Sequence, residues 1–378
     1  MKVHNDVMNA LNEKKDVILV LLDLSAAFDT LDHSVLLHRL EHRFGISGTV
    51  LQWLKSYLSH RKQRVSLDSF MSEPSDLLFG VPQGSVLGPI LFTLYTAPLE
   101  DIFALHGINS MLYADDTQLY MVCNRPSDIR NAVEECLEDI CTWMKSNLLV
   151  LNSDKTEVIH LTSRHKKVVE EPNSLRIGQS VFTPSNSVRN LGVLFEHGGN
   201  FSGYINQICK SAYFALHRIG KIRSLLDQAA TEKLVHAFVS SKLDYCNSVL
   251  YGCPDFQLDK LQSVQNAAAR LVTRQKKSSH ITPILRNLHW LSIRDRITFK
   301  VLLIVFKIFH NLAPLYLCAL IDRYIPGRNG LRSGNPDLYL LKRQDNKSTT
   351  KSYGMRAFTI YAPLLWNALP QKTVNRKV

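Results

Sequence analysis

Hydrophobic and polar positions over the first 200 residues form short apolar runs separated by stripes at helical spacing. Residues 17–22 read Val-Ile-Leu-Val-Leu-Leu, an unbroken run that predicts a β-strand buried on both faces. Residues 34–45 and 49–58 each carry apolar side chains at helical spacing, with Ser34 as the expected N-cap of the first helix and Gly45 at its end. This half of the chain is therefore expected to mix helices with strands.

The same reading extends to residue 200 and predicts a sheet with helices along the chain. The remaining expected elements are a helix at 3–13, a basic strand at 61–67 that leads into a hairpin, a Gly/Pro turn at 80–84, helices at 85–94 and 127–147, and strands at 148–151, 158–161 and 191–195. With the hairpin at 108–122, their order predicts an α+β sandwich with helices on one face of the sheet.

Beyond residue 200 the pattern becomes helical. Residues 205–222 and 258–272 are amphipathic, whereas 297–310 are almost continuously apolar and are expected to be buried. Residues 325–352 mix Pro, Gly and charge and are expected to form a loop or connector. At 378 residues, the chain is long enough for two or three domains.

Charge divides the chain at the same place. Residues 1–200 contain 18 Lys and Arg against 24 Asp and Glu, whereas residues 201–378 contain 27 against 9, for a total of +12. An acidic first half suits metal-dependent catalysis, and a basic second half suits a polyanion such as nucleic acid. A generic basic surface is the alternative for the second half.

Cysteine usage and hydropathy exclude several classes of protein. The seven cysteines are scattered without a Cys-x-x-Cys pair, which argues against a zinc module and a disulfide framework and favours a reducing compartment. Residues 1–6 lack the apolar core of a signal peptide. The longest apolar runs, 17–22 and 301–306, are too short to span a bilayer, so no membrane association is expected.

Three aspartates are candidate metal ligands. Asp115 and Asp116 are adjacent between two short apolar runs, and Asp23 directly follows the apolar run at 17–22. Adjacent carboxylates at a hairpin tip repel each other, so a cation is expected to hold them there. Nucleotidyl transfer uses two metal ions about 3.5–4 Å apart, and carboxylates from two neighbouring strands can bridge such a pair. The alternative is that each Asp is an ordinary turn or cap residue.

A Gly-rich segment and an aromatic residue accompany these carboxylates. Residues 80–89 read Gly-Val-Pro-Gln-Gly-Ser-Val-Leu-Gly-Pro before an expected helix, whose free N–H groups would favour negative charge. Phe28 follows Asp23 by five residues, across small side chains, and could form the floor for a nucleotide sugar. An ordinary turn and a core Phe are the competing interpretations.

Taken together, the motifs resemble a known family. Residues 21–33 (Leu-Leu-Asp-Leu-Ser-Ala-Ala-Phe-Asp-Thr-Leu-Asp-His), 80–89 and the Tyr-Ala-Asp-Asp of 113–116 are similar, in order and spacing, to the reverse transcriptase of LINE-type (non-LTR) retrotransposons. The similarity continues through 151–157 and 190–193 and reaches the tail at 356–370, so it covers nearly the whole chain.

The resemblance implies an RNA-directed DNA polymerase with a right-hand fold. Its antiparallel palm sheet, with helices on one face, would occupy 1–200, a basic helical thumb 201–290, and a helical C-terminal region and tail 291–378. The implied partners are an RNA template, a DNA primer and deoxynucleoside triphosphates, and the implied cofactor is a pair of Mg²⁺ ions, with Mn²⁺ as a substitute. The family's life cycle implies the cytoplasm and nucleus. The sequence predicts no oligomeric state.

The resemblance also implies roles for single residues. Lys155 would protonate the pyrophosphate leaving group, with a surface lysine as the alternative, and Phe28 would disfavour a ribose 2′-hydroxyl. The implied roles of the others are metal binding for Asp23, Asp115 and Asp116, substrate binding for Pro82, Gln83, Gly84 and Tyr113, and primer grip for Leu191, Gly192 and Val193.

The chain departs from the family pattern before the first motif. Only 22 residues precede Asp23, so a fingers region and an endonuclease are expected to be missing, as in a truncated copy or a partial gene. A catalytically inactive nucleic-acid-binding remnant is therefore the alternative function. A group II intron maturase or a telomerase fits the residues at 23–29 and the tail less well.

Overall fold

The structure is a computed structural model that describes residues 1–25, 27–82, 84–125, 127, 130–163, 174–177, 180–325, 340–343 and 349–370. The chain divides into two compact units that are interleaved along the sequence. The sheet unit comprises residues 16–160 and 167–191, and the helical unit comprises residues 1–15, 161–166 and 192–378.

The sheet unit contains most of the strands. Its elements are β1 (Asp16–Leu22), β2 (Leu24–Ser25), α2 (His33–His42), α3 (Gly48–Leu58), β3 (Lys62–Gln63), β4 (Ser66–Leu67), β5 (Phe70–Met71), β6 (Ser75–Asp76), α4 (Gly88–Thr96), α5 (Leu99–Leu105), β7 (Asn109–Tyr113), β8 (Asp116–Cys123), α6 (Arg130–Ser146), β9 (Val150–Leu151), β10 (Glu157–Leu161), β11 (Leu175–Ile177), β12 (Ser180–Phe182) and β13 (Ser187–Asn190). Four of the strands form the main sheet, in the order β10-β1-β8-β7.

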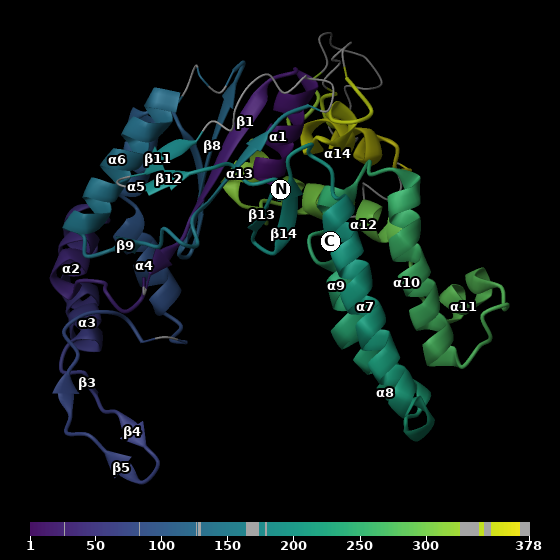
Figure 1. Ribbon diagram of the computed structural model, residues 1–378, viewed down its shortest axis with the longest axis horizontal. Coiled ribbons are helices and arrows are strands. Elements are labelled where there is room, and N and C mark those ends of the chain that lie inside the picture. The colour runs from purple at the N-terminus through teal and green to yellow at the C-terminus, as the bar shows by residue number, and fades with distance from the viewer. Residues whose placement is uncertain are drawn as a thin grey trace. The chain divides into compact units, whose positions relative to one another are not determined.

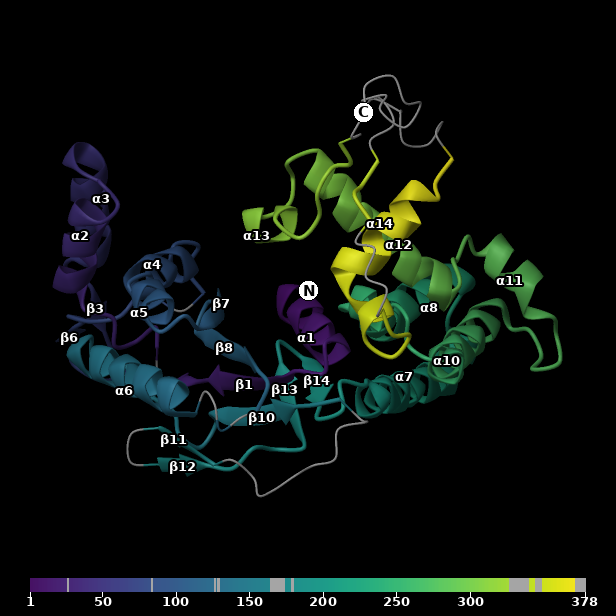
Figure 2. The same cartoon turned by 90° about the horizontal axis from the view of Figure 1, so that it is seen from above.

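Strand β1 lies in the interior of this sheet, as its unbroken apolar run predicts. Val17 and Leu19 on one face, and Val20 and Leu22 on the other, are all buried. β1 pairs antiparallel with β8, which in turn pairs antiparallel with β7 through a tight hairpin. Figure 2 shows β7, β8, β1 and β10 side by side. The α+β expectation, with an antiparallel sheet and many helices, is confirmed.

One face of β1 shares a hydrophobic core with the helices of this unit. Val20 and Leu22 belong to the same cluster of buried side chains as Phe92 of α4, Phe103 of α5 and Leu137 of α6. Burying a large apolar side chain contributes roughly 1.5–3 kcal/mol each, so this cluster fixes the sheet beneath the helices. The loops at the strand ends are therefore held by a rigid support.

Two helix starts differ from the sequence prediction. Asp32 caps α2, because its carboxylate accepts hydrogen bonds from the backbone N–H groups of Ser34 and Val35. Ser34 therefore lies inside the helix and donates its backbone N–H to the Asp32 cap, and it is not the N-cap itself. Helix α4 begins at Gly88 instead of residue 85, because the Ser85 hydroxyl accepts from the Gly88 N–H and Pro89 occupies the first turn. In both cases, side-chain hydrogen bonding moved the boundary.

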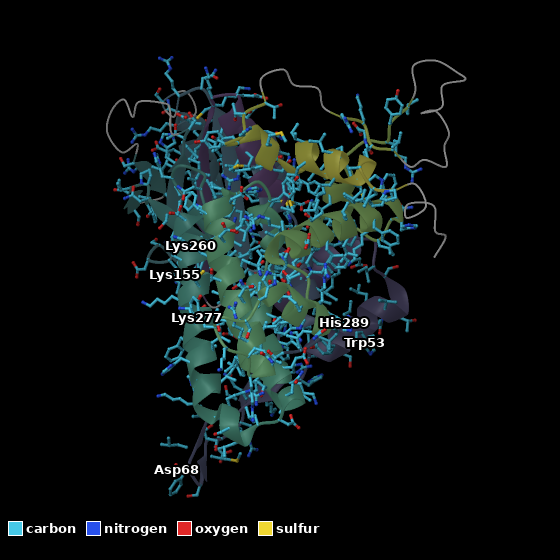
Figure 3. All side chains as sticks on the ribbon, turned by 90° about the vertical axis from the view of Figure 1, so that its right-hand side faces the viewer. Trp53, Asp68, Lys155, Lys260, Lys277 and His289 are labelled. Atoms are coloured by element: carbon cyan, nitrogen blue, oxygen red, sulfur yellow. The ribbon has the colours of Figure 1, made fainter. Side chains whose placement is uncertain are left out.

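The basic segment after α3 forms an exposed arm of two short hairpins. β3 pairs with β6, and β4 pairs with β5 at the outer end. Figure 1 shows the arm protruding beyond α3, and Asp68, labelled in Figure 3, lies in the turn at its tip. The predicted strand at 61–67 is therefore broken into two-residue pieces with little core contact.

The helical unit contains the elements of the second half together with the first helix of the chain. They are α1 (Lys2–Asn12), β14 (Val193–Glu196), α7 (Ser202–Ile222), η2 (Arg223–Leu225), α8 (Gln228–Val235), η3 (His236–Ser240), α9 (Ser241–Asp244), η4 (Asn247–Leu250), α10 (Asp255–Thr273), α11 (Ile281–Asn287), α12 (Ile293–Phe309), α13 (Leu315–Cys318), η7 (Gly354–Arg356) and α14 (Phe358–Asn367). The predicted helices at 205–222 and 258–272 are confirmed as α7 and α10.

Helix α1 is held by the C-terminal segment. The Asn5 side chain accepts a hydrogen bond from the backbone N–H of Thr359 at 2.9 Å, and that of Asn12 accepts one from Thr350 at 2.8 Å. Asn9 donates to the Thr359 hydroxyl at 3.2 Å. Figure 2 shows α1 close to the C-terminal segment that leads into α14. Residues separated by more than 330 positions in sequence thus form one local structure.

Helix α12 differs from the expectation of a fully buried helix. Its buried side chains, Ile293, Ile297, Val301 and Val305, recur every four residues along one face. Phe299 on another face is 55% exposed. The predicted connector at 325–352 lies mostly outside the described residues. None of the described helices combines the length and the apolarity needed to cross a membrane.

Candidate active site

The pairing of β1 with β8 brings the first candidate carboxylates together. Leu22 of β1 pairs with Thr117 of β8. Continuing this antiparallel register by one residue places Asp23 opposite Asp116. The two strands are neighbours in the sheet, which is the arrangement the sequence argument required. Asp115 precedes Asp116 in the β7–β8 turn and completes the group.

The turn that carries Asp115 is conformationally unusual. Ala114 has a φ of 53°, a left-handed conformation that an alanine adopts only at an energetic cost of about 1–2 kcal/mol. Tyr113 and Asp116 pair across the turn, and the Tyr113 side chain is 66% exposed. Strain of this kind persists where the surrounding structure holds the turn in place, as the sheet does here.

Electrostatics show that the three carboxylates interact. The pKa of Asp116 is raised above its ordinary value, first by partial burial and then by the like charges of Asp115 and Asp23. Each of these three effects disfavours the charged form of Asp116. A cation bound among the three carboxylates would relieve this repulsion.

Lys155 lies close to Asp23. Its Nζ is 3.8 Å from Asp23 Oδ2, and the lysine side chain remains 70% exposed. Pairing of β2 with β9 brings this loop to Asp23, and the Asn152 N–H donates to the Asp23 carbonyl at 2.8 Å. The structure therefore brings Lys155 to one of the three predicted carboxylates.

The donor set fits a divalent cation in its chemistry. Asp23 Oδ2 is buried without a hydrogen-bond partner, and carboxylate oxygens are the ligands that Mg²⁺ prefers. As the side chains stand, no group of three or more His, Cys, Asp or Glu among the described residues is arranged to hold a metal ion. Asp23, Asp115 and Asp116 are the residues that would hold one here.

The Gly-rich segment at 80–89 packs closely against the backbone of Phe28 and Asp29. The Val81 N–H donates to the Phe28 carbonyl at 2.8 Å. Gly80 has a φ of 81°, and a Cβ there would lie 2.8 Å from the carbonyl oxygens of both Phe28 and Asp29. Only glycine fits this crossing. The Phe28 ring is half-buried and contacts Phe92, with ring centroids 5.0 Å apart.

Sequence reasoning missed two side chains that help to hold these loops. His33 Nε2 lies 2.7 Å from the Gly80 carbonyl, and the Thr156 hydroxyl lies 3.5 Å from the Asp23 N–H. His33 closes the string at 21–33 that carried the resemblance, and Thr156 directly follows Lys155 in the similar segment at 151–157. Their places within these two similar segments were the sequence feature that could have identified both residues.

The remaining predicted positions are less constrained. Pro82 is half-buried, Gly84 is exposed with a φ of 78°, and Gln83 lies outside the described residues. Leu191 is the last residue of the sheet unit along the chain, and Gly192 and Val193 belong to the last segment of the helical unit, so the structure assigns the three predicted primer-grip residues to different units.

Comparison with known proteins identifies the family. The family model described as "Reverse transcriptase (RNA-dependent DNA polymerase)" matches residues 2–195, just over half of the chain. The chain belongs to the reverse transcriptase family. The match covers every carboxylate of the site and Lys155.

Curated relatives show that this chain is related to the reverse transcriptases of non-LTR retrotransposons. It is 26% identical to the probable RNA-directed DNA polymerases from transposon BS and from transposon X-element, both of Drosophila melanogaster, over 77% and 78% of this chain. It is 23% identical to the RNA-directed DNA polymerase from mobile element jockey of Drosophila funebris, over 72% of this chain. The alignments cover only 33%, 32% and 30% of these relatives, so the chain spans about a third of their length.

Solved telomerase structures show a weaker likeness. The structure of telomerase from Candida albicans with a telomeric RNA fragment aligns at a TM-score of 0.37 and 13% identity, covering 76% of this chain and 52% of that one. Apo telomerase from Candida Tropicalis aligns at 0.40 and 11%, covering 76% and 46%. These scores are low, and the sequence family alone supports the assignment.

Proposed function

We propose that this reverse transcriptase chain is an RNA-directed DNA polymerase that extends a DNA primer on an RNA template from deoxynucleoside triphosphates. The observation that supports this most directly is the β1–β8 register, which sets Asp23 opposite Asp116 beside Asp115. Family membership supports the reaction type.

In the proposed mechanism, Asp23, Asp115 and Asp116 hold two divalent cations, Mg²⁺ or Mn²⁺. When bound, such ions lower the pKa of the primer hydroxyl and neutralise the departing pyrophosphate. The three carboxylates orient the reacting groups at the ends of β1 and β8. Their charged forms would bind the cations, and bound cations would offset the burial and the like charges that raise the pKa of Asp116.

Lys155 is the proposed proton donor to the pyrophosphate. Its ammonium group lies within 3.8 Å of Asp23, and its high exposure leaves it free to reorient toward a leaving group. Phe28 is proposed to lie beneath the nucleotide sugar and to disfavour a ribose 2′-hydroxyl. The remaining substrate contacts are proposed for Pro82, Gln83, Gly84 and Tyr113, and the primer grip for Leu191, Gly192 and Val193.

For the chain as a whole, we propose a palm over residues 1–200, a basic thumb-like region over 201–290, and a C-terminal region over 291–378. The excess of Lys and Arg after residue 200 supports contact of the second half with template and primer phosphates.

The test is primer extension by the purified chain on an RNA template with Mg²⁺ and deoxynucleotides. Asp115→Asn should lower the extension rate by about a thousandfold or more, because metal-ion catalysis supplies several kcal/mol. Asp68→Asn is the matched control, since Asp68 lies at the tip of the exposed arm with a φ of 49° that Asn also adopts readily. Its extension should equal that of the natural chain.

Two results would refute the catalytic proposal. Undiminished extension by a normally melting Asp115→Asn chain would exclude Asp115 as a ligand. Absence of extension by the natural chain, with duplex binding intact, would instead identify a nucleic-acid-binding remnant.

A further inference from the structure

The helical unit contains a pocket far along the chain from the carboxylates. It is a cavity of about 710 Å³ where the C-terminal halves of α7 and α10 meet. These helices run side by side in the same direction, since Ser202 bonds to Gln257 at one end and Arg223 bonds to Leu271 at the other (Figure 2). Both helix C-termini therefore lie at this pocket.

The lining of the pocket is strongly cationic. It includes Arg223, Arg270, Arg274 and Lys277, and none of the described residues that line it is Asp or Glu. Each helix C-terminus carries about half a negative charge, so the two ends together offset about one of the four positive charges. A large excess of positive charge remains.

Arg223 also stabilises the backbone around the pocket, and the hydrogen bonds that it makes there do not neutralise its charge. Arg223 donates to the carbonyls of Leu271, Leu226 and Val272 at 2.8, 2.7 and 2.7 Å. The bonds to Leu271 and Val272 cap the end of α10, but a carbonyl is neutral and does not cancel a guanidinium charge. Asp227, the carboxylate that acts on Arg223, is engaged at the N-terminus of α8 and does not line the pocket.

Two further observations indicate that the pocket favours an anion. Arg270 lines the cavity, and its Nε is buried without a hydrogen-bond partner, while its Nη2 donates to the Ser279 carbonyl at 3.2 Å. The pKa of Arg223 is lowered, first by burial and then by the nearby charge of Arg274. Like charges thus repel one another at this site, and a bound anion would relieve the repulsion.

We propose that this pocket binds phosphate groups of a nucleic-acid backbone. The cationic groups supply the phosphate recognition, and the Tyr213 and Asn266 side chains in the lining give a nucleotide further contacts. The phosphate chemistry follows from the pocket itself. The choice of nucleic acid over free phosphate or a mononucleotide as its source rests on the proposed function.

Lys277 provides the cleanest test, because it is exposed in the loop after α10 and can be removed without disturbing a helix cap (Figure 3). Binding of a fluorescent RNA–DNA duplex by the full chain is measured by anisotropy, with EDTA present and nucleotides absent. Lys277→Ala should weaken binding roughly three- to tenfold and reduce the slope of log Kd against log salt by about one. Lys277→Arg should restore both.

Lys145→Ala is the matched control, since Lys145 is an exposed lysine of α6 in the sheet unit, outside both the pocket and the proposed active site. It should leave affinity and slope nearly unchanged. Equal losses in both variants, or unchanged binding by Lys277→Ala, would overturn the proposal.

A second measurement distinguishes the sources of phosphate. Acetylation of Lys277, followed by mass spectrometry, should be blocked by the duplex at concentrations where inorganic phosphate and deoxyadenosine monophosphate give no protection. Protection by the small anions alone would overturn nucleic acid as the ligand. If the chain extends no primer but Lys277→Ala still weakens duplex binding, the phosphate pocket is supported and the polymerase proposal is refuted.

Discussion

In the sheet unit, Asp115 and Asp23 act electrostatically on Asp116 at the ends of β1 and β8, whereas in the helical unit cationic side chains line a cavity where α7 and α10 end. The negative group is positioned by strand register, with Asp23 opposite Asp116. The positive group is positioned by helix capping, with Arg223 bonded to the last carbonyls of α10. Each unit therefore uses its own backbone geometry to hold like charges together.

The difference shows how a fold can prepare a binding site before its ligand arrives. Like charges held near each other cost free energy, and that cost is recovered only when a group of opposite charge binds. The site proposed in the sheet unit would take cations, and the pocket proposed in the helical unit would take phosphates. A polymerase has to bind both kinds of group.

The largest expected effect tests the backbone support on the sheet side. Gly80→Ala should lower the free energy of unfolding by about 2–4 kcal/mol, because the new methyl group meets the Phe28 and Asp29 carbonyls in a left-handed conformation. Gly84→Ala is the matched control. Its φ of 78° is similar, but nothing lies within 4 Å of its Cβ position, so it should cost only about 1–2 kcal/mol.

Urea unfolding of the two variants measures this difference. Equal losses of stability would show that the crossing of residue 80 over residues 28 and 29 is not tightly packed. The carboxylate loop would then lack the support that the comparison assigns to it.

The next effect sharpens the comparison through pH. His4 is fully buried in the helical unit without hydrogen-bond partners, and its pKa is lowered well below 6.5 by burial and then by the positive charge of Arg356. Between that lowered pKa and 6.5 the unfolded state binds more protons, so stability present above pH 6.5 is lost as the pH falls. The loss should reach about 1.4 kcal/mol per pH unit at most.

His4→Phe should abolish this dependence on pH, because phenylalanine has no group that titrates. The variant should still fold, because phenylalanine can keep the ring contact that His4 makes with Phe201. Hydrogen exchange of the α1 amides between pH 7.5 and 5.5 measures it. His289→Asn is the control, since His289 is exposed with a φ of 55° that Asn tolerates. An identical pH response in His4→Phe and the natural chain would contradict the assignment.

The smallest expected effect is on the melting temperature and concerns Asp116, whose charge should destabilise the fold at neutral pH. The raised pKa of Asp116 means that its charge destabilises the folded state, and this penalty disappears as the pH falls through that pKa. Asp116→Asn should therefore leave the melting temperature at pH 7.5 unchanged or slightly higher, although it removes a proposed ligand. A marked fall in the melting temperature would show that Asp116 stabilises the fold instead of straining it.

Much of the sheet unit could be predicted from the sequence. The apolar run at 17–22 predicted β1, and the repeat of apolar positions every four residues predicted α6, because strand and helix periods are local properties. The resemblance located the carboxylates and Lys155 by order along the chain. Helix starts were less predictable, since Asp32 and Ser34 are both residues favoured at an N-cap and only Asp32 takes that position.

The basic pocket could not be predicted in this way. Arg223 and Arg270 are almost fifty residues apart, and nothing in their spacing indicates that α7 and α10 run in parallel with their ends together. The attachment of α1 to the C-terminal segment was equally hidden. Asn5 and Thr359 meet only because the chain returns to its first helix.

The sequence by itself determined the family, the kinds of element in each half, and the residues available for metal and phosphate chemistry. Those properties depend on local periodicity, composition and the order of motifs. Only the tertiary structure decided that Asp23 and Asp116 lie at adjoining ends of paired strands, that Lys155 lies beside Asp23, and that four cationic side chains line one cavity. These depend on register and packing between distant segments, which are set by the burial of whole faces and not by neighbours along the chain.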